Sequence, residues 1–126
     1  MLRTIPLPFE QAVTRVKDEL AKEGFGVLSE IDVTATLKKK LNQDFRPYVI
    51  LGACNPALAF RALSAERDIG VLLPCNVVVY TADAAGQSVV VAIDPESSLG
   101  RTGRSDLAPL AAEVKARLAR VLAALP

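Results

Sequence analysis

The amino-acid sequence predicts an α+β fold, with helices packed on a mixed and mainly antiparallel sheet. Apolar residues recur at helical spacing near both ends of the chain, whereas the middle contains short runs of β-branched and aliphatic residues. Two of these runs, 75–80 and 88–93, flank the turn-forming segment Asp83 to Gly86, which predicts an antiparallel hairpin. The expected order of elements is α-β-α-β-α-β-β-α.

Length and composition favour one domain over residues 1–126, because this length supports a single hydrophobic core. The formal net charge is +1, with acids and bases interspersed, so the clustered basic face of a nucleic-acid-binding protein is missing. No apolar run approaches the roughly 20 residues that cross a bilayer, and the N-terminus lacks a signal-peptide pattern. We therefore expect a cytoplasmic protein that binds neither nucleic acid nor membranes, with reduced cysteines.

The chain contains no histidine. This excludes Ser-His-Asp and Cys-His catalysis within one chain, together with every histidine-containing metal site. The two cysteines supply only half of a tetrahedral zinc site. A metal would need carboxylates such as Asp94, or a second chain contributing two more thiolates. We therefore expect neither a metal site nor a cofactor.

A first helix is expected over residues 8–23. Pro8 suits its first turn, where the missing N–H costs nothing. Gly24 suits its end, because glycine tolerates the left-handed conformation there. The apolar residues of this segment share one face: Phe9, Ala12, Val13, Val16 and Leu20.

A strand is expected over 25–31, followed by a short helix that Asp32 caps. Val33, Leu37 and Leu41 lie along one face of that helix. Lys38 to Lys40 form either a solvated face, favoured by the helix dipole, or an anion-binding patch.

The loop 42–47 leads to a strand over 48–51, which is nearly continuous in apolar character and so is expected to be covered on both faces. A helix over 56–65 follows, with Asn55 as its cap and Pro56 as its first residue. Four of its residues are expected to face inward: Leu58, Ala59, Ala62 and Leu63.

A third apolar run covers 69–73, and the 48–73 unit resembles a crossover. Pro74 interrupts this run because it cannot donate a ladder hydrogen bond. Asp94-Pro95 is expected to end the strand that begins at 88. Residues 96–105 are expected to form a mobile connection.

Arg101 and Arg104, in that connection, could clamp a phosphate or carboxylate, or could simply be solvated. The last helix is expected over 106–124. Its broad apolar stripe consists of Leu107, Leu110, Ala111, Val114, Leu118, Val121 and Leu122.

Both cysteines lie in Cys-Asn pairs, Cys54-Asn55 and Cys75-Asn76. The first pair precedes a helix, whose free N–H groups could stabilise a thiolate or bind an anionic ligand. If the two strands that carry the pairs are neighbours, the pairs converge on a small pocket. The candidate ligand-binding residues are therefore Cys54, Asn55, Cys75 and Asn76, with Asp94, Arg101 and Arg104 as secondary candidates. The alternative is purely structural, because cysteine often fills core volume and Asn55 is explained by capping.

Five segments, taken in this order, resemble the domain of unknown function 302 family: Gly24-Phe25-Gly26-Val27, Glu30-Ile31-Asp32, Leu51-Gly52-Ala53-Cys54-Asn55-Pro56, Leu72 to Val79, and Asp94-Pro95. The resemblance covers roughly residues 8–95. It implies a small α+β domain, often dimeric, with no settled activity. The resemblance also implies that family members vary at the position of Cys54, whereas Asn55-Pro56 and Pro74 are the more general elements of the pattern. This favours a structural or ligand-framing role for Asn55 and Pro74, with thiol chemistry at most a subfamily feature.

Three functions remain open from the sequence. The first is a non-enzymatic module that binds a small ligand or anion at the two Cys-Asn pairs. The second is a thiol-dependent enzyme or redox protein that uses Cys54. The third is a homodimeric interaction subunit, for which the stripe at 107–122 would supply the apolar surface.

Overall fold

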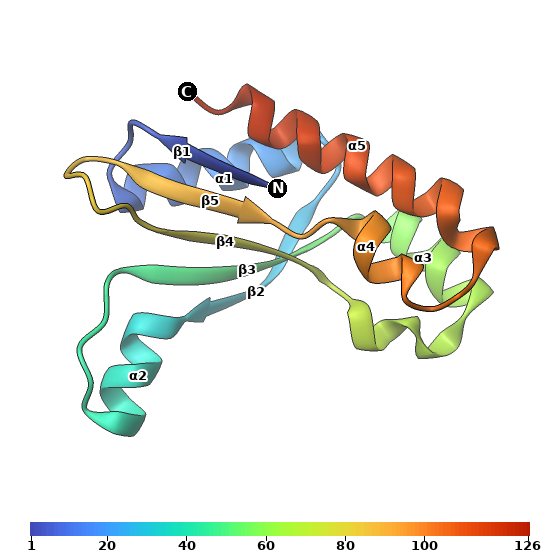
Figure 1. The fold of residues 1–126 in the computed structure, drawn as a ribbon, viewed down its shortest axis with the longest axis horizontal. Coiled ribbons are helices and arrows are strands. Elements are labelled where there is room, and N and C mark those ends of the chain that lie inside the picture. The colour runs from blue at the N-terminus through green and yellow to red at the C-terminus, as the bar shows by residue number, and fades with distance from the viewer.

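The computed structural model describes residues 1–126 and has the predicted α+β architecture (Figure 1). Its core is one five-stranded sheet in the order β1-β5-β4-β3-β2, and each strand pairs with its neighbours in antiparallel fashion. The strands are β1 (Leu2–Ile5), β2 (Gly26–Asp32), β3 (Tyr48–Cys54), β4 (Cys75–Thr81) and β5 (Ser88–Ala92).

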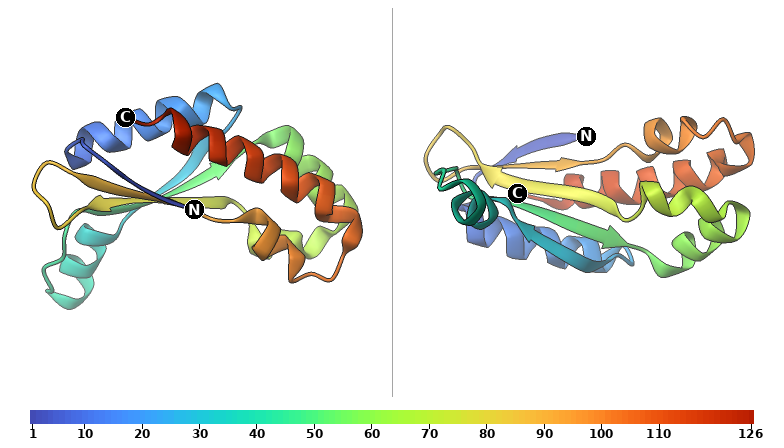
Figure 2. Two further views of the ribbon diagram at one scale, coloured as in Figure 1. Left: turned by 45° about the horizontal axis from the view of Figure 1, so that its top comes forward. Right: turned by 90° about the horizontal axis from the view of Figure 1, so that it is seen from below.

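All helices except α2 cover one face and one end of this sheet (Figures 1 and 2). The helices are α1 (Phe9–Lys22), α2 (Val33–Leu41), α3 (Pro56–Ala65), α4 (Pro95–Gly100) and α5 (Ala108–Ala124), with short 3-10 helices η1 (Arg67–Leu72) and η2 (Ser105–Leu107). The long helices α1 and α5 lie on the same face of the sheet, whereas α3 and α4 gather at one end. Helix α2 lies at the end of the sheet away from α3 and α4, on the side opposite α1 and α5 (Figure 2).

The hydrophobic core lies between the sheet and the face formed by α1 and α5. Alternate strand residues point into it, among them Leu51 of β3, Val79 of β4 and Val90 of β5, which are all fully buried. Helix α1 contributes Val16 and Leu20 from its predicted apolar face. The whole apolar stripe predicted for the last helix is buried in this core, so it is not free for a partner.

The predicted helix boundaries are confirmed by their caps. The Oδ1 atoms of Asp32 and Asn55 accept hydrogen bonds from the backbone N–H groups of Ala35 and Leu58, at 2.9 and 3.2 Å. Gly24 ends α1 with a φ of +84°, which is the left-handed conformation expected of it.

Three predictions for the region around α3 are wrong. The unit over 48–73 is not a crossover, because β3 and β4 are antiparallel neighbours joined through α3 and η1. The run 69–73 is not a strand but lies largely in η1, since Glu66 caps the amide of Asp68 and only Ile69 of η1 is buried. Leu63, expected to face inward, remains 39% exposed.

Two elements were not predicted from the sequence. Strand β1 is short, and the charged Arg3 interrupts its apolar residues, so its sequence pattern is weak. A hydrogen bond from Arg3 to the carbonyl of Leu122 in α5 stabilises this strand at the edge of the sheet. Helix α4 replaces part of the expected mobile connection. Asp94-Pro95 starts this helix, with the Asp94 Oδ1 accepting from the Glu96 amide at 3.0 Å.

The expectation that the strand over 48–51 is covered on both faces is not met within the chain. Val49 and Leu51 are buried under the helices, whereas Tyr48 and Ile50, on the other face, are partly exposed. The sheet therefore has one covered face and one open face. No helix of the chain combines the length and the apolar character that crossing a bilayer requires.

Candidate functional site

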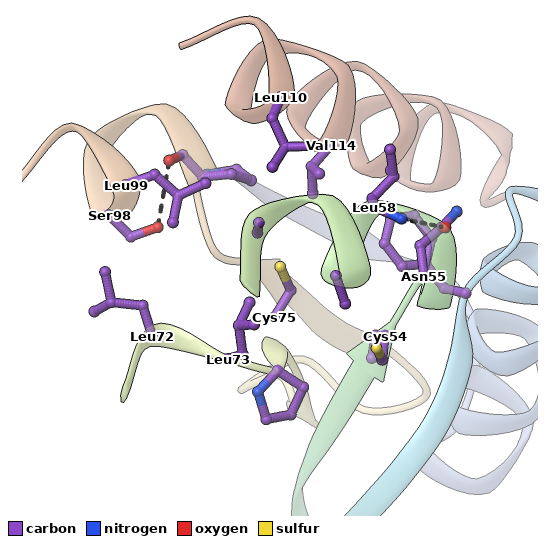
Figure 3. Close-up of a pocket in the computed structure, with 16 residues that line it drawn as sticks. Cys54, Asn55, Leu58, Leu72, Leu73, Cys75, Ser98, Leu99, Leu110 and Val114 are labelled. Atoms are coloured by element: carbon purple, nitrogen blue, oxygen red, sulfur yellow. Dashed lines mark hydrogen bonds between the residues drawn. The ribbon is translucent and has the colours of Figure 1, made fainter. Parts of the chain in front are cut away.

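An apolar pocket, here called the thiol pocket, opens where β3 and β4 run into the helical end of the molecule (Figure 3). Its walls come from the ends of β3 and β4, from α3, from α4 and from α5. Besides Cys54 and Cys75, the residues that define it are Leu58 of α3, Leu99 of α4, and Leu110 and Val114 of α5.

The strand register places both cysteines at the same end of β3 and β4. Cys75 pairs with Ala53 across β4 and β3, and Cys54 is the next residue of β3. Because side chains alternate along a strand, Cys75 lies on the same face as the buried Val77 and Val79. Cys54, at the last position of β3, lines the same pocket.

The Cys75 thiol lies in surroundings that disfavour its charged form. Burial, and to a smaller extent the proximity of Cys54, raise the pKa of Cys75 from its ordinary value of 9.0 to about 11. At neutral pH Cys75 is therefore a protonated, weakly polar thiol. Both thiols are free, and both are half-buried.

Asn55 lies at the pocket rim, but its carbonyl oxygen is already engaged in capping α3. Its amide nitrogen packs against Gly24, where an added Cβ would lie only 2.8 Å from Asn55 Nδ2. The first turn of α3 is therefore already capped by a side chain. No Lys or Arg lines the pocket near this turn.

Asn76 does not join the other three candidates. It follows Cys75 in the strand and so lies on the opposite, open face of the sheet, where it is exposed. Its partner across the sheet is Gly52, and it is not part of the pocket wall.

The secondary candidates are held by structural contacts. Asp94 caps α4 and pairs with Lys115 of α5 at 3.0 Å, and the Lys115 ammonium keeps the pKa of that carboxyl below its ordinary value. Arg104 pairs with Asp106 at 2.6 Å and with Glu66 at 3.2 Å, and it donates to the carbonyl of Ala65 at 2.8 Å. It therefore ties the end of α3 to the start of η2. Arg101 is exposed and lies outside the pocket.

The lining of the thiol pocket is chemically neutral. Of its 16 residues 12 are hydrophobic, and none carries a charge. Asn55, Ser98 and the two thiols are the polar groups, and the Ser98 hydroxyl already donates to the carbonyl of Pro95 at 3.4 Å. No group of three or more His, Cys, Asp or Glu side chains could hold a metal ion.

The inner volume of the pocket is about 40 Å³, and it reaches about 480 Å³ when its open mouth is counted. One water needs roughly 10–15 Å³ on the smaller measure, so the inner space accommodates a group of a few heavy atoms. Leu72, Leu73 and Cys75 are half-buried, and they mark where the pocket meets solvent.

Comparison with known proteins assigns the chain to a family. Residues 2–125 match the family model described as "Domain of unknown function DUF302". This chain belongs to the DUF302 family. A crystal structure of an uncharacterized conserved protein DUF302 from Bacillus stearothermophilus is similar along 100% of this chain and 97% of its own, with a TM-score of 0.92 and 32% sequence identity. A search of curated proteins found no match.

Sequence reasoning missed several wall residues of the pocket in this DUF302 protein. Ser98 and Leu99 were not considered because α4 was expected to be a mobile connection. The Asp94-Pro95 pair repeats the cap-then-proline pattern of Asn55-Pro56, and it could have predicted this helix. Leu110 and Val114 were predicted as core residues, and they form the floor of the pocket.

Proposed function

We propose that this DUF302 domain is a non-catalytic module that binds a small, neutral and mainly aliphatic ligand in the thiol pocket. The observation that carries the proposal is the meeting of Cys54 and Cys75 at one opening in an otherwise apolar wall. Small-molecule sites are typically concave and apolar, with a few polar groups at defined positions. The thiols, Asn55 and Ser98 supply such groups here.

The chemistry of the lining favours a neutral ligand over the anion that the sequence also suggested. A buried carboxylate or phosphate would need a cation or several free N–H donors. The pocket has no Lys or Arg. The Leu58 N–H at the start of α3 already donates a hydrogen bond to the Asn55 side chain, so it is not free for a ligand. A short aliphatic chain with a hydroxyl or thiol end would fit the small inner volume and leave its polar end near the mouth.

Thiol-dependent catalysis or redox chemistry is less well supported. A nucleophilic cysteine acts as its thiolate, and the raised pKa of Cys75 keeps this thiol protonated at neutral pH, so Cys75 offers Cys54 no thiolate partner. The chain also has no histidine to act as the neighbouring base. In this proposal the two thiols contact the ligand and form no bond with it.

A matched pair of probes tests the proposal and separates the neutral ligand from the anion. Isotope-labelled protein would be titrated with 1-butanol and with butyrate, which share a chain length and differ in charge. We expect saturable amide shifts for butanol around Cys54, Leu58 and Cys75, and none for butyrate. Saturable shifts with butyrate alone would favour an anionic ligand over a neutral one. No saturable shifts with either probe would contradict a small-ligand site in the thiol pocket.

A further inference from the structure

The short helix η1 forms one side of the mouth of the thiol pocket. Leu72 at its end and Leu73 beyond it line the pocket on the side of Cys75 (Figure 3). Leu99 of α4 and Leu110 of α5 line the other side (Figure 3). A molecule that reaches the inner volume of about 40 Å³ from the mouth must therefore pass η1.

A single side chain anchors η1 in the hydrophobic core. Ile69 is 2% exposed and belongs to the core, whereas Val71 is 88% exposed and Gly70 is also exposed. The backbone hydrogen bonds at both ends of η1 are local. The amide of Ile69 donates to the carbonyl of Glu66, directly before the segment, and that of Leu73 donates to Gly70, inside it. A segment with few buried apolar contacts and local hydrogen bonds opens at a lower free energy than the core does.

The residues that flank η1 separate it from its neighbours. Glu66 and Leu73 both have extended backbone, with φ values of −148° and −117°, so η1 is a separate unit between α3 and β4. Arg104 fixes the first of these positions, because it pairs with the Glu66 carboxylate at 3.2 Å and donates to the Ala65 carbonyl at 2.8 Å. Beyond this base, η1 packs mainly against α3. Residues at the ends of elements are the positions that absorb the rotation of a moving lid.

We propose that η1 is a lid on the thiol pocket, with Ile69 as its latch and with Glu66 and Leu73 as its hinges. Release of the Ile69 side chain from the core carries Leu72 away from the mouth and opens the path to the inner volume. This role rests on the proposed function, since the lid serves the ligand that binds in the pocket. Closure of a lid over a bound ligand excludes water from the site.

Alkylation of the Cys75 thiol measures the opening without any ligand. Iodoacetamide is neutral and about as small as 1-butanol, and the thiol that it must reach lines the pocket next to Leu73. At one fixed pH, the rate of alkylation of Cys75 therefore follows the open fraction of the lid. Trypsin separates Cys75 from Cys54, because Arg61 and Arg67 lie between them, so mass spectrometry of the peptides follows each thiol by itself.

Gly70→Ala should stabilise the closed lid. The φ of Gly70 lies outside the left-handed region, and an added Cβ would meet only Cδ2 of Leu63, at an ordinary 3.9 Å. Because alanine has less freedom than glycine in the open segment, the alkylation of Cys75 should slow about two- to fivefold. Gly100→Ala is the matched control, since Gly100 is exposed on α4 and nothing lies within 4 Å of a Cβ there. It should leave the rate unchanged.

Ile69→Val should have the opposite effect, because it removes one buried carbon from the latch. The alkylation of Cys75 should become about two- to tenfold faster. Val71→Ala, at the exposed position two residues further on, should not change the rate.

Equal rates in the native protein, Gly70→Ala and Ile69→Val would overturn the lid. Equal slowing by Gly70→Ala and Gly100→Ala would also overturn it, because the thiol would then be reached by unfolding of the whole domain. The titration with 1-butanol judges the ligand separately. A protein whose alkylation responds to η1 but which binds no butanol would retain the lid and lose the proposed function.

Discussion

Cys75 is the cross-strand partner of Ala53, and this register brings the Cys75 thiol to the same pocket as the neighbouring Cys54. The pairing depends on where β3 and β4 end. Strand β4 begins at Cys75 directly after Pro74, and β3 ends at Cys54 directly before the cap residue Asn55. The two ends meet under α3, α4 and α5, which close the pocket.

Gly52→Ala should destabilise the protein by about 1–3 kcal/mol, in the range of overpacking substitutions. A Cβ at Gly52 would lie 2.8 Å from Cγ of Pro74 and would also clash with Oγ of Ser29. Gly26→Ala is the matched control on the adjacent strand, because nothing lies within 4 Å of a Cβ there. Urea unfolding of both variants measures the difference. Equal stabilities would show that the Pro74 ring does not pack tightly over Gly52.

The stability of the protein should fall between about pH 9 and pH 11, because the pKa of Cys75 is raised on folding. In this window the unfolded thiol loses its proton while the folded thiol retains it, so the folded state binds more protons and rising pH favours unfolding. The full loss in the free energy of unfolding is about 2–3 kcal/mol, from the difference between the ordinary pKa of 9.0 and the folded-state pKa of about 11. Unfolding experiments at several pH values would measure it. Cys75→Ser supplies the control, since lysines and tyrosines titrate in both proteins, and identical pH profiles would refute the prediction.

Arg104→Ala should lower the unfolding temperature, whereas Arg101→Ala should leave it unchanged. Arg104 joins Glu66, Asp106 and the Ala65 carbonyl, so its removal frees the end of α3 from η2. The exposed Arg101 makes no hydrogen bond or ion pair through its side chain and serves as the control. Differential scanning calorimetry with and without phosphate separates two roles. If phosphate raises the unfolding temperature of the native protein but not that of Arg104→Ala, Arg104 binds phosphate, as the sequence suggested, and does more than connect α3 to η2.

The sequence predicted the elements whose local chemistry is complete within a few residues. The caps Asp32 and Asn55, the helix end at Gly24 and the hairpin between β4 and β5 all follow from neighbouring residue types. The convergence of Cys54 and Cys75 required one further assumption, that their strands are neighbours, and this is correct.

The features that the sequence did not predict depend on tertiary contacts. Strand β1 has four residues and is secured by α5 through Arg3. The run at 69–73 has strand-like composition, but it lies largely in η1, where Ile69 alone packs into the core and Val71 is 88% exposed. The side of the strand on which Asn76 lies follows from alternation once β4 is known to begin at Cys75.

The most direct test of the ligand proposal compares two leucine substitutions on α3 for their binding of 1-butanol. Ala59 lines the thiol pocket, whereas Ala57 on the same helix is exposed and does not. Ala59→Leu fills the pocket, so the amide shifts induced by butanol at Cys54 and Cys75 should disappear. Ala57→Leu should bind butanol as the native protein does. Unchanged binding in a folded Ala59→Leu variant would contradict a ligand site in the thiol pocket.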